Sequence, residues 1–217
     1  MPCSSCAADS LDIFGEKRAR RELRRYLKDG LGGTDARQIA AWAEEGGLRD
    51  ATVVEIGGGI GQIQAELLRR GAASGRVVEA LGAYADLAGE LARSVGIADR
   101  TSFEVRDPLA DPEAVAAADI VVLRRVVCCS PDGPELLGVG ATKARRVLLA
   151  SYPRDRRLAR ILIWLENASF WVMRKRFRTY LHAPAELERA AGRHGLSRTR
   201  VARGMVWETA QFDTAAS

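Results

Sequence analysis

The chain has 217 residues, of which 47% are hydrophobic and 28% are charged, as in globular proteins that bury a core. This composition excludes disordered, collagen-like and disulfide-scaffold proteins, and no uncharged apolar run is long enough for a transmembrane helix. The formal net charge is +5. We expect a cytoplasmic protein of one medium-sized domain, without a secretory leader and without a membrane partner.

Basic residues are concentrated in two stretches, residues 17–28 and 154–178, and alternate elsewhere with Asp and Glu. Such stripes are one feature of nucleic-acid-binding proteins. However, aromatic residues make up only 6% of the chain and are not interleaved with the basic ones as stacking platforms. The pattern therefore disfavours a nucleic-acid partner.

The four cysteines, Cys3, Cys6, Cys128 and Cys129, have a spacing that invites a zinc interpretation. Neighbouring side chains diverge, so Cys128 and Cys129 are poorly placed to reach one tetrahedral ion. We predict no metal site and interpret the four groups as free thiols in a reducing compartment.

Taken in chain order, residues 11–46 predict two helices broken at 30–34, before the first strand. Short apolar runs predict five strands, at 51–56, 76–80, 101–105, 119–127 and 145–151. Helical periodicity predicts further helices at 60–70, 83–95 and 184–194. A closing hairpin is expected from strands 197–203 and 205–212, joined at Gly204. Residues 152–183 form an insertion with an apolar, Arg-edged helix around residues 158–173, where a substrate lid would be placed.

The alternation of strands and helices predicts an α/β fold, a Rossmann-like seven-stranded sheet with helices on both faces. Most strands are expected to be parallel, and the C-terminal hairpin antiparallel. We divide the chain into an N-terminal helical extension or lid, residues 1–46, and a main domain, residues 47–217, which includes the helical insertion after the fifth strand.

A glycine-rich loop, Glu55-Ile56-Gly57-Gly58-Gly59-Ile60-Gly61, lies directly after the first strand and before a helix. Glycines allow sharp turns and close approach of a ligand to the backbone, and the helix start offers free N–H groups. Such a loop predicts a nucleotide-like site at the carboxyl edge of the sheet. No Gly-Lys-Ser/Thr follows, which excludes a P-loop, and the glycine spacing differs from the dinucleotide fingerprint.

An acidic residue two positions before the first glycine, Glu55, together with this spacing, resembles motif I of class I S-adenosylmethionine-dependent methyltransferases. In that family the loop holds the aminocarboxypropyl chain and ribose of the cofactor. The resemblance implies an acid at the end of the second strand, where Glu79 stands, for the ribose hydroxyls. It also implies an acid after the third strand, where Asp107 stands, near the adenine amino group. The expected cofactor site comprises Glu55, Gly57, Gly58, Gly59, Gly61, Glu79, Ala80, Asp107, Pro108 and Arg124.

Three further segments are similar to magnesium-protoporphyrin O-methyltransferases and their bacterial relatives: 123–132 (LRRVVCCSPD), 151–154 (SYPR) and 177–182 (FRTYLH). The resemblance covers roughly residues 40–212 and does not identify the substrate.

Candidate acceptor-site residues come from the loop after the fourth strand, the insertion and the first helix. They are Tyr26, Arg125, Cys128, Cys129, Tyr152, Asn167, Tyr180 and His182. A hydroxyl acceptor needs a base, for which His182 is the better placed of two histidines, although the alternative of a structural histidine that caps the helix from Pro184 is favoured. Arg125 and Tyr152 are the other catalytic candidates. We expect either Arg124 or Arg125 to face the site, since strand neighbours point to opposite sides.

An arginine there could lower the pKa of a thiol acceptor or bind the carboxylate of an acceptor, and the sequence does not decide between these two interpretations. Cys128 and Cys129 could exchange with a disulfide substrate or simply fill space. The sequence thus predicts a methyltransferase that acts on a thiol sulfur, or on a carboxylate or hydroxyl oxygen, of a small molecule. Methylation of RNA ribose and a non-catalytic cofactor-binding subunit are the alternatives.

Overall fold

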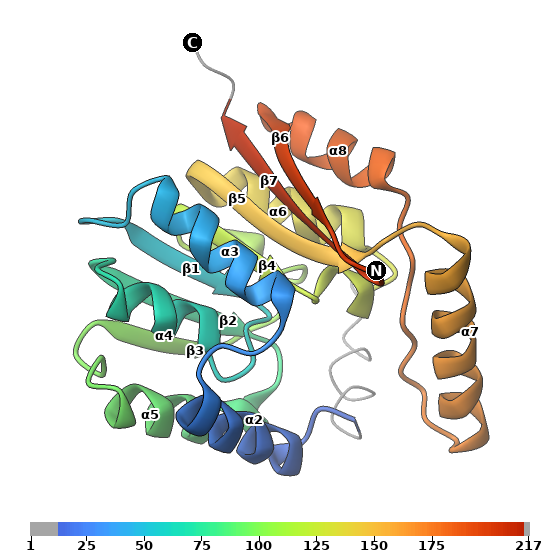
Figure 1. The fold of residues 1–217 in the computed structure, drawn as a ribbon, viewed down its shortest axis with the longest axis horizontal. Coiled ribbons are helices and arrows are strands. Elements are labelled where there is room, and N and C mark those ends of the chain that lie inside the picture. The colour runs from blue at the N-terminus through green and yellow to red at the C-terminus, as the bar shows by residue number, and fades with distance from the viewer. Residues whose placement is uncertain (1–12, 215–217) are drawn as a thin grey trace.

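The computed structural model describes residues 13–214, and their centre is one seven-stranded sheet (Figure 1). Its strand order is β3-β2-β1-β4-β5-β7-β6. The strands are β1 (Thr52–Ile56), β2 (Ser74–Glu79), β3 (Thr101–Val105), β4 (Ala118–Arg124), β5 (Ala144–Pro153), β6 (Leu196–Arg203) and β7 (Trp207–Thr214). Cys3 and Cys6 lie outside the described residues.

The first five strands are parallel, and β7 pairs antiparallel with both β5 and β6. This arrangement confirms the predicted fold class. The order reverses between β1 and β4, so the chain crosses over after β3 and leaves a crevice at the carboxyl ends of these strands.

Alternate residues of the central strands face two separate apolar cores. Val53 and Val122 contribute to one core, and Val54 and Val121 to the other. The first core is covered by α2 (Glu16–Asp29), α3 (Thr34–Glu45), α4 (Gln62–Arg69) and α5 (Ala85–Ser94). The second is covered by α6 (Gly133–Lys143) and α8 (Pro184–Gly192). Burial on both faces explains why these strands read as continuous apolar runs.

The two N-terminal helices belong to the first core. In α2 the buried Ala19, Leu23 and Tyr26 recur at helical spacing, and in α3 Ile39 and Trp42 are buried in the same cluster. The helices end and begin near Gly30 and Gly33, both with positive φ, close to the predicted break. The division of the chain at residue 46 stays a prediction.

Helix α6 is absent from the sequence prediction, because it contains three glycines and Pro134. Proline is tolerated in the first turn, where its missing N–H has no partner to lose. A Cβ on Gly140 would lie 2.6 Å from Leu123 Cδ1, so glycine is required for this helix to pack closely on β4. Tertiary packing therefore outweighs low helix propensity here.

Several predicted boundaries shift. Strand β4 does not continue to residue 127 but ends at Arg124, because Arg125 adopts a left-handed φ of 53° and a short 3-10 turn, Val127–Cys129, follows. The helix expected from residue 60 begins at Gln62, after Gly61 with φ 77°. The helix expected at 83–95 opens as a 3-10 turn, Gly82–Tyr84, before α5. The last strand begins at Trp207 rather than at 205.

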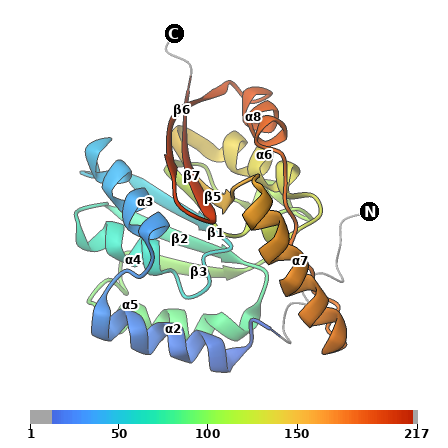
Figure 2. The ribbon, with the colours of Figure 1, turned by 45° about the vertical axis from the view of Figure 1, so that its right-hand side comes forward.

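The insertion after β5 contains the long helix α7 (Arg157–Val172). Figure 1 and Figure 2 show α7 at one side of the molecule, away from the helices that cover the sheet. Only Ala159 and Phe170 of this helix are buried. No helix among residues 13–214 is long and apolar enough to cross a membrane.

Candidate active site

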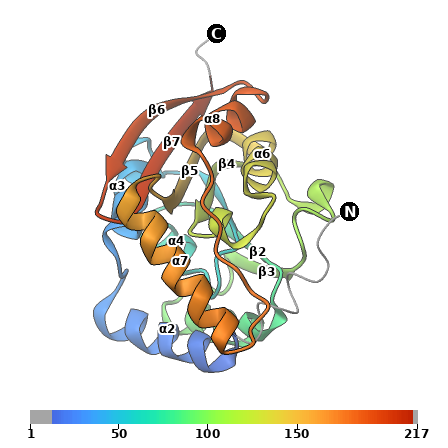
Figure 3. The same cartoon turned by 90° about the vertical axis from the view of Figure 1, so that its right-hand side faces the viewer.

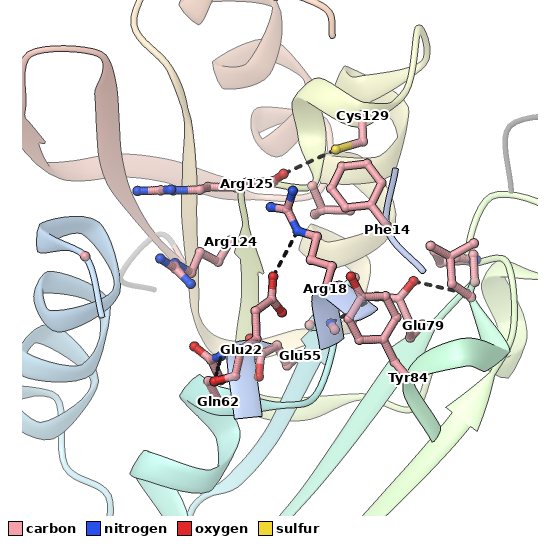
Figure 4. Close-up of a pocket in the computed structure, with 18 of the residues that line it drawn as sticks. Phe14, Arg18, Glu22, Glu55, Gln62, Glu79, Tyr84, Arg124, Arg125 and Cys129 are labelled. Atoms are coloured by element: carbon pink, nitrogen blue, oxygen red, sulfur yellow. Dashed lines mark hydrogen bonds and ion pairs between the residues drawn. The ribbon is translucent and has the colours of Figure 1, made fainter. Parts of the chain in front are cut away.

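A cavity of about 460 Å³ lies at the carboxyl ends of β1, β2 and β4, at the reversal of strand order (Figure 4). Its volume is within the range of small-molecule sites. Nine of the ten predicted cofactor-site residues line it: Glu55, Gly57, Gly58, Gly59, Glu79, Ala80, Asp107, Pro108 and Arg124. The parallel strands place these residues together because their carboxyl ends share one edge of the sheet.

The tenth residue, Gly61, lies behind the loop. A Cβ at Gly61 would come within 2.8 Å of Val77 Cγ2 on β2, so this glycine lets the start of α4 pack against the sheet. Gly57 and Gly59 have φ of 64° and 57°, values that favour glycine. A Cβ at Gly58 would lie 2.6 Å from the Glu55 side chain. The absence of side chains thus leaves the Glu55 carboxyl and the loop backbone open to the cavity.

Glu55 is the deepest acid of the site, with 2% of its surface exposed. Its Oε2 accepts a hydrogen bond from the Gln64 backbone N–H at 3.0 Å. Burial raises the pKa of Glu55 to about 7, although the hydrogen bond from Gln64 and the charge of Arg124 act in the opposite direction. A buried carboxyl group with a raised pKa favours a cationic partner, because a nearby positive charge stabilises its ionised form.

Glu79 ends β2 and joins it to the glycine loop. Its Oε2 accepts from Gly59 N–H at 3.0 Å, and its Oε1 accepts from Leu81 N–H at 3.1 Å. Burial raises the pKa of this carboxyl, and hydrogen bonds from the backbone of Gly59 and Leu81 oppose that effect. Each carboxylate oxygen has a second lone pair, so the group can still accept hydrogen bonds from a ligand in the cavity.

Asp107 follows β3 and lines the cavity. Its Oδ1 accepts from Leu109 N–H at 2.9 Å, a local turn that fixes the side chain beside Pro108. The cavity is also lined here by Pro108 and by the apolar side chain of Leu109. This end of the cavity therefore combines one carboxylate with apolar surface.

Arg124 and Arg125 both line the cavity, which corrects the prediction that only one would. Their guanidinium groups converge on Asp35, from the first turn of α3. Arg124 Nε lies 3.0 Å from Asp35 Oδ2, and Arg125 Nη2 lies 2.7 Å from Asp35 Oδ1. The left-handed conformation of Arg125 turns its side chain to the same side as that of its neighbour. Trp207 stacks under the Arg125 guanidinium at 4.3 Å.

Asp35 is 4% exposed and also accepts a hydrogen bond from the Ser151 hydroxyl at 3.3 Å. Burial alone would raise its pKa, but the hydrogen bonds and charges of Arg125 and Arg124 outweigh burial and hold the pKa below its usual value. Two guanidinium groups thus share one carboxylate, and this cluster carries a net positive charge at the cavity wall.

Helix α2 covers the cavity from the other side. Tyr26 lines it and donates from its hydroxyl to Glu66 Oε2 at 3.1 Å. Arg18 pairs with Glu22 at 3.0 Å within the cavity lining, as Figure 4 shows. Of these residues only Tyr26 was predicted, although the spacing of four residues places Arg18 and Glu22 on the same helix face as Tyr26. Asp35 and Tyr84 were not predicted either, and no local sequence signal points to them.

His182 is not among the described residues that line the cavity. Its Nε2 lies 3.2 Å from Val127 O and 3.0 Å from Ser130 O. Both partners are carbonyl acceptors, so Nε2 carries the hydrogen and His182 clamps the loop that follows β4. His182 thus has a structural contact rather than the position of a base over the site, but it does not cap α8, whose N-terminus has no side-chain hydrogen bond.

Three other candidates form structural contacts instead of lining the cavity. Tyr152 is 1% exposed and donates to Glu208 Oε1 at 3.4 Å. Asn167 exchanges two hydrogen bonds of 2.8 Å with the backbone of Thr179. The ring of Tyr180 stacks on His182. Of the three predicted catalytic candidates, Arg125 alone reaches the cavity wall.

The two neighbouring cysteines have different surroundings. Cys128 is buried, whereas Cys129 lines the cavity. Both thiols lie near the Arg125 carbonyl oxygen, at 3.5 Å and 3.4 Å. A hydrogen bond with Cys128, together with burial, raises the pKa of Cys129, so that this side chain is held as a thiol. A protonated thiol is a weak nucleophile, which favours the space-filling interpretation.

No protein-family model matches the sequence, and no curated protein matches it. The structure, by contrast, is similar to solved methyltransferases. Magnesium protoporphyrin IX methyltransferase from Synechocystis, solved with bound SAH, is 19% identical over 94% of this chain and 97% of that chain, with a TM-score of 0.71. An O-methyltransferase family protein from Burkholderia thailandensis is 18% identical over 93% of this chain and 60% of that one, with a TM-score of 0.73.

The chain has the methyltransferase fold. A third structure, an O-methyltransferase family 2 protein from Planctomyces limnophilus in complex with apigenin, agrees, with 14% identity, 98% and 65% coverage and a TM-score of 0.67. The resemblance predicted from the glycine loop is therefore confirmed for the fold. It extends over more of the chain than residues 40–212, because the N-terminal helices are included in the matched 94%.

Proposed function

We propose that this protein is an S-adenosylmethionine-dependent methyltransferase that acts on a small molecule. The observation that carries the proposal is the convergence of Glu55, Glu79 and Asp107, from three different strand ends, around one cavity beside the glycine loop. Proteins of the same fold have been solved with SAM and SAH bound.

The residues of the cavity fit the chemical groups of this cofactor. Glu79 would accept from the two ribose hydroxyls, and Asp107 from the adenine amino group beside apolar Leu109. The buried Glu55 would face the ammonium group, whose positive charge stabilises an ionised carboxylate. Arg124 would face the cofactor carboxylate.

The cofactor supplies a methyl group on a positively charged sulfur. The chain contributes alignment of the acceptor and exclusion of water rather than a covalent step. Helix α2 closes the cavity with Tyr26, and Phe14, two residues before the helix, lines the cavity as well. Asp35 neutralises only part of the charge of Arg124 and Arg125, so this wall of the cavity attracts an anion.

With the cofactor carboxylate on Arg124, the partly exposed guanidinium of Arg125 is the group left to bind an acceptor, and it favours one that carries a carboxylate. A carboxylate is ionised at neutral pH and needs no base, and no histidine is among the described residues that line the cavity. An acidic phenol or a thiol beside the same arginines is the second acceptor class, because a nearby guanidinium lowers its pKa.

The test is calorimetric titration of the purified protein with S-adenosylmethionine, S-adenosylhomocysteine and NAD. Glu79→Ala should weaken binding of both sulfur compounds by about 10- to 100-fold, because hydrogen bonds to a charged group contribute roughly 1.5–3 kcal/mol. Glu113→Gln is the matched control, since its side chain is 94% exposed and lies away from the cavity.

Transfer of a labelled methyl group to a panel of carboxylic acids, phenols and thiols then identifies the acceptor class. Absence of binding, or a preference for NAD, would overturn the proposal. Tight binding without transfer to any acceptor would instead support a non-catalytic subunit.

A further inference from the structure

Helix α7 exposes an apolar face to solvent. Its largest exposed side chains are those of Ile161, Trp164, Leu165, Trp171 and Val172, which we call the α7 face. Between 51% and 72% of the surface of each of these residues is exposed. Exposed apolar surface of this extent on one element is typical of an interaction site.

The α7 face is continuous because its residues recur at helical spacing. Positions 161, 164, 165, 171 and 172 fall on one side of a helix with 3.6 residues per turn. Ala159 and Phe170, the two buried residues of α7, fall on the opposite side. The helix therefore has apolar residues on both its inner and its outer side.

No residue of α7 is among the described residues that line the cavity. Figure 3 shows α7 crossing in front of the other elements at one side of the molecule. The ring of Phe170 contacts Phe177 at 5.7 Å, and Phe177 contacts Phe14 of the cavity lining at 5.1 Å. Thus α7 is anchored through its inner side, and the α7 face needs a partner from outside the described chain.

Charges at the two ends of α7 indicate the chemistry of that partner. Arg156 and Arg157 are exposed at its start, and Arg174 and Arg176 are exposed just beyond its end. Glu166 is the one acidic residue within the helix. A second copy packed along α7, in either direction, would bring cationic ends together, which disfavours self-association. An anionic partner surface complements both ends.

We propose that the α7 face docks on an anionic phospholipid bilayer, with Trp164 and Trp171 at the headgroup level and the flanking arginines on the lipid phosphates. This reverses the expectation of no membrane partner. That expectation rested on the lack of a transmembrane run, which a helix lying in the plane of the surface does not need. The proposal does not depend on the proposed function.

The test is co-sedimentation of the full chain with phosphatidylcholine vesicles, with and without phosphatidylglycerol. We expect binding to the mixed vesicles, a blue shift of tryptophan fluorescence, and weakening in high salt. Trp164→Glu/Trp171→Glu should lower the partition coefficient at least about 10-fold. Leu27→Glu is the matched control, because Leu27 is an apolar side chain on α2 that is 47% exposed and does not line the cavity, and it should bind as the natural chain does.

A second variant, Arg174→Glu/Arg176→Glu, keeps the α7 face and should lose the preference for phosphatidylglycerol. Circular dichroism and S-adenosylhomocysteine binding report whether each variant is folded. Equal sedimentation of the natural chain with and without vesicles would overturn the proposal. So would a dimer in analytical ultracentrifugation that Trp164→Glu/Trp171→Glu dissociates, because a second copy would then occupy the α7 face.

Discussion

Glu55 combines a buried position with a titratable group, and this makes the stability of the protein depend on pH. Burial raises its pKa from 4.5 to about 7. Between these values the unfolded chain releases the proton while the folded chain keeps it. The folded state then binds more protons, so the free energy of unfolding decreases as pH rises through this window.

We predict that Glu55→Gln removes this pH dependence. The free energy of unfolding of the variant, relative to the natural chain, should increase by about 3 kcal/mol between about pH 5 and pH 8, because 1 pKa unit corresponds to about 1.4 kcal/mol. Urea unfolding without cofactor at several pH values measures the difference. Parallel curves for the two proteins would contradict the assigned burial of the charge.

Asp35 pairs with both arginines of the cavity wall, and no sequence signal predicted this role. It stands in the first turn of a helix, where acids are common for reasons of the helix dipole alone. Its partners, Arg124 and Arg125, follow almost 90 residues later. The left-handed conformation of Arg125, rather than its residue type, brings both guanidiniums to one carboxylate.

The loop between β4 and α6 shapes one wall of the cavity. It turns at Arg125 and forms the 3-10 turn Val127–Cys129, and its carbonyl groups at residues 127 and 130 accept from His182. Because the histidine follows α7 in the chain, this contact ties the insertion to the sheet. The loop thereby depends on a residue more than 50 positions away for its conformation.

We predict that His182→Ala destabilises the protein by about 1–3 kcal/mol, because two carbonyl groups lose their donor. The pH profile of methyl transfer should keep its shape, since the histidine does not face the cavity. Urea unfolding and the rate measured against pH separate the two effects. Loss of an ionisation near neutral pH from the rate profile would show that His182 acts as a base after all.

At the scale of the whole molecule, the cavity is lined by elements that are far apart in the chain, from Phe14 to Leu136. Helix α2, the three acids and the loop after β4 all contact the same space. A ligand there contacts all of these elements at once, and its binding free energy adds to the stability of the folded chain.

Accordingly, S-adenosylhomocysteine at 100 times its dissociation constant should stabilise the folded state by about 2.7 kcal/mol. For a chain of this size the Tm should rise by about 5–10 °C. Differential scanning calorimetry measures the shift, and NAD at the same concentration should produce none. We also expect slower amide exchange in α2, the element that covers the cavity; an unchanged α2 would argue against its role in closure.

The sequence by itself determined the alternating order of strands and helices and the position of the cofactor-type site. The reason is local: a strand, a glycine loop and a helix fix the crossover, and parallel crossovers bring every carboxyl strand end to one edge. Glu55, Glu79 and Asp107 were predicted because the resemblance to class I methyltransferases places acids at or near these strand ends. Helix α6 was not predictable, because its glycines lower its helix propensity, and the close packing of Gly140 against Leu123 is seen only in the folded chain.

Only the tertiary structure decided which side chains from distant elements complete the site. Burial, backbone turns and contacts across the sheet placed Asp35, Arg18 and Tyr84 in or beside the cavity and kept His182 and Tyr152 out of it. The same holds for α7, whose apolar residues have the composition of a core helix. Whether such a helix is covered or exposed depends on what packs against it, and that is a property of the folded chain rather than of its sequence pattern.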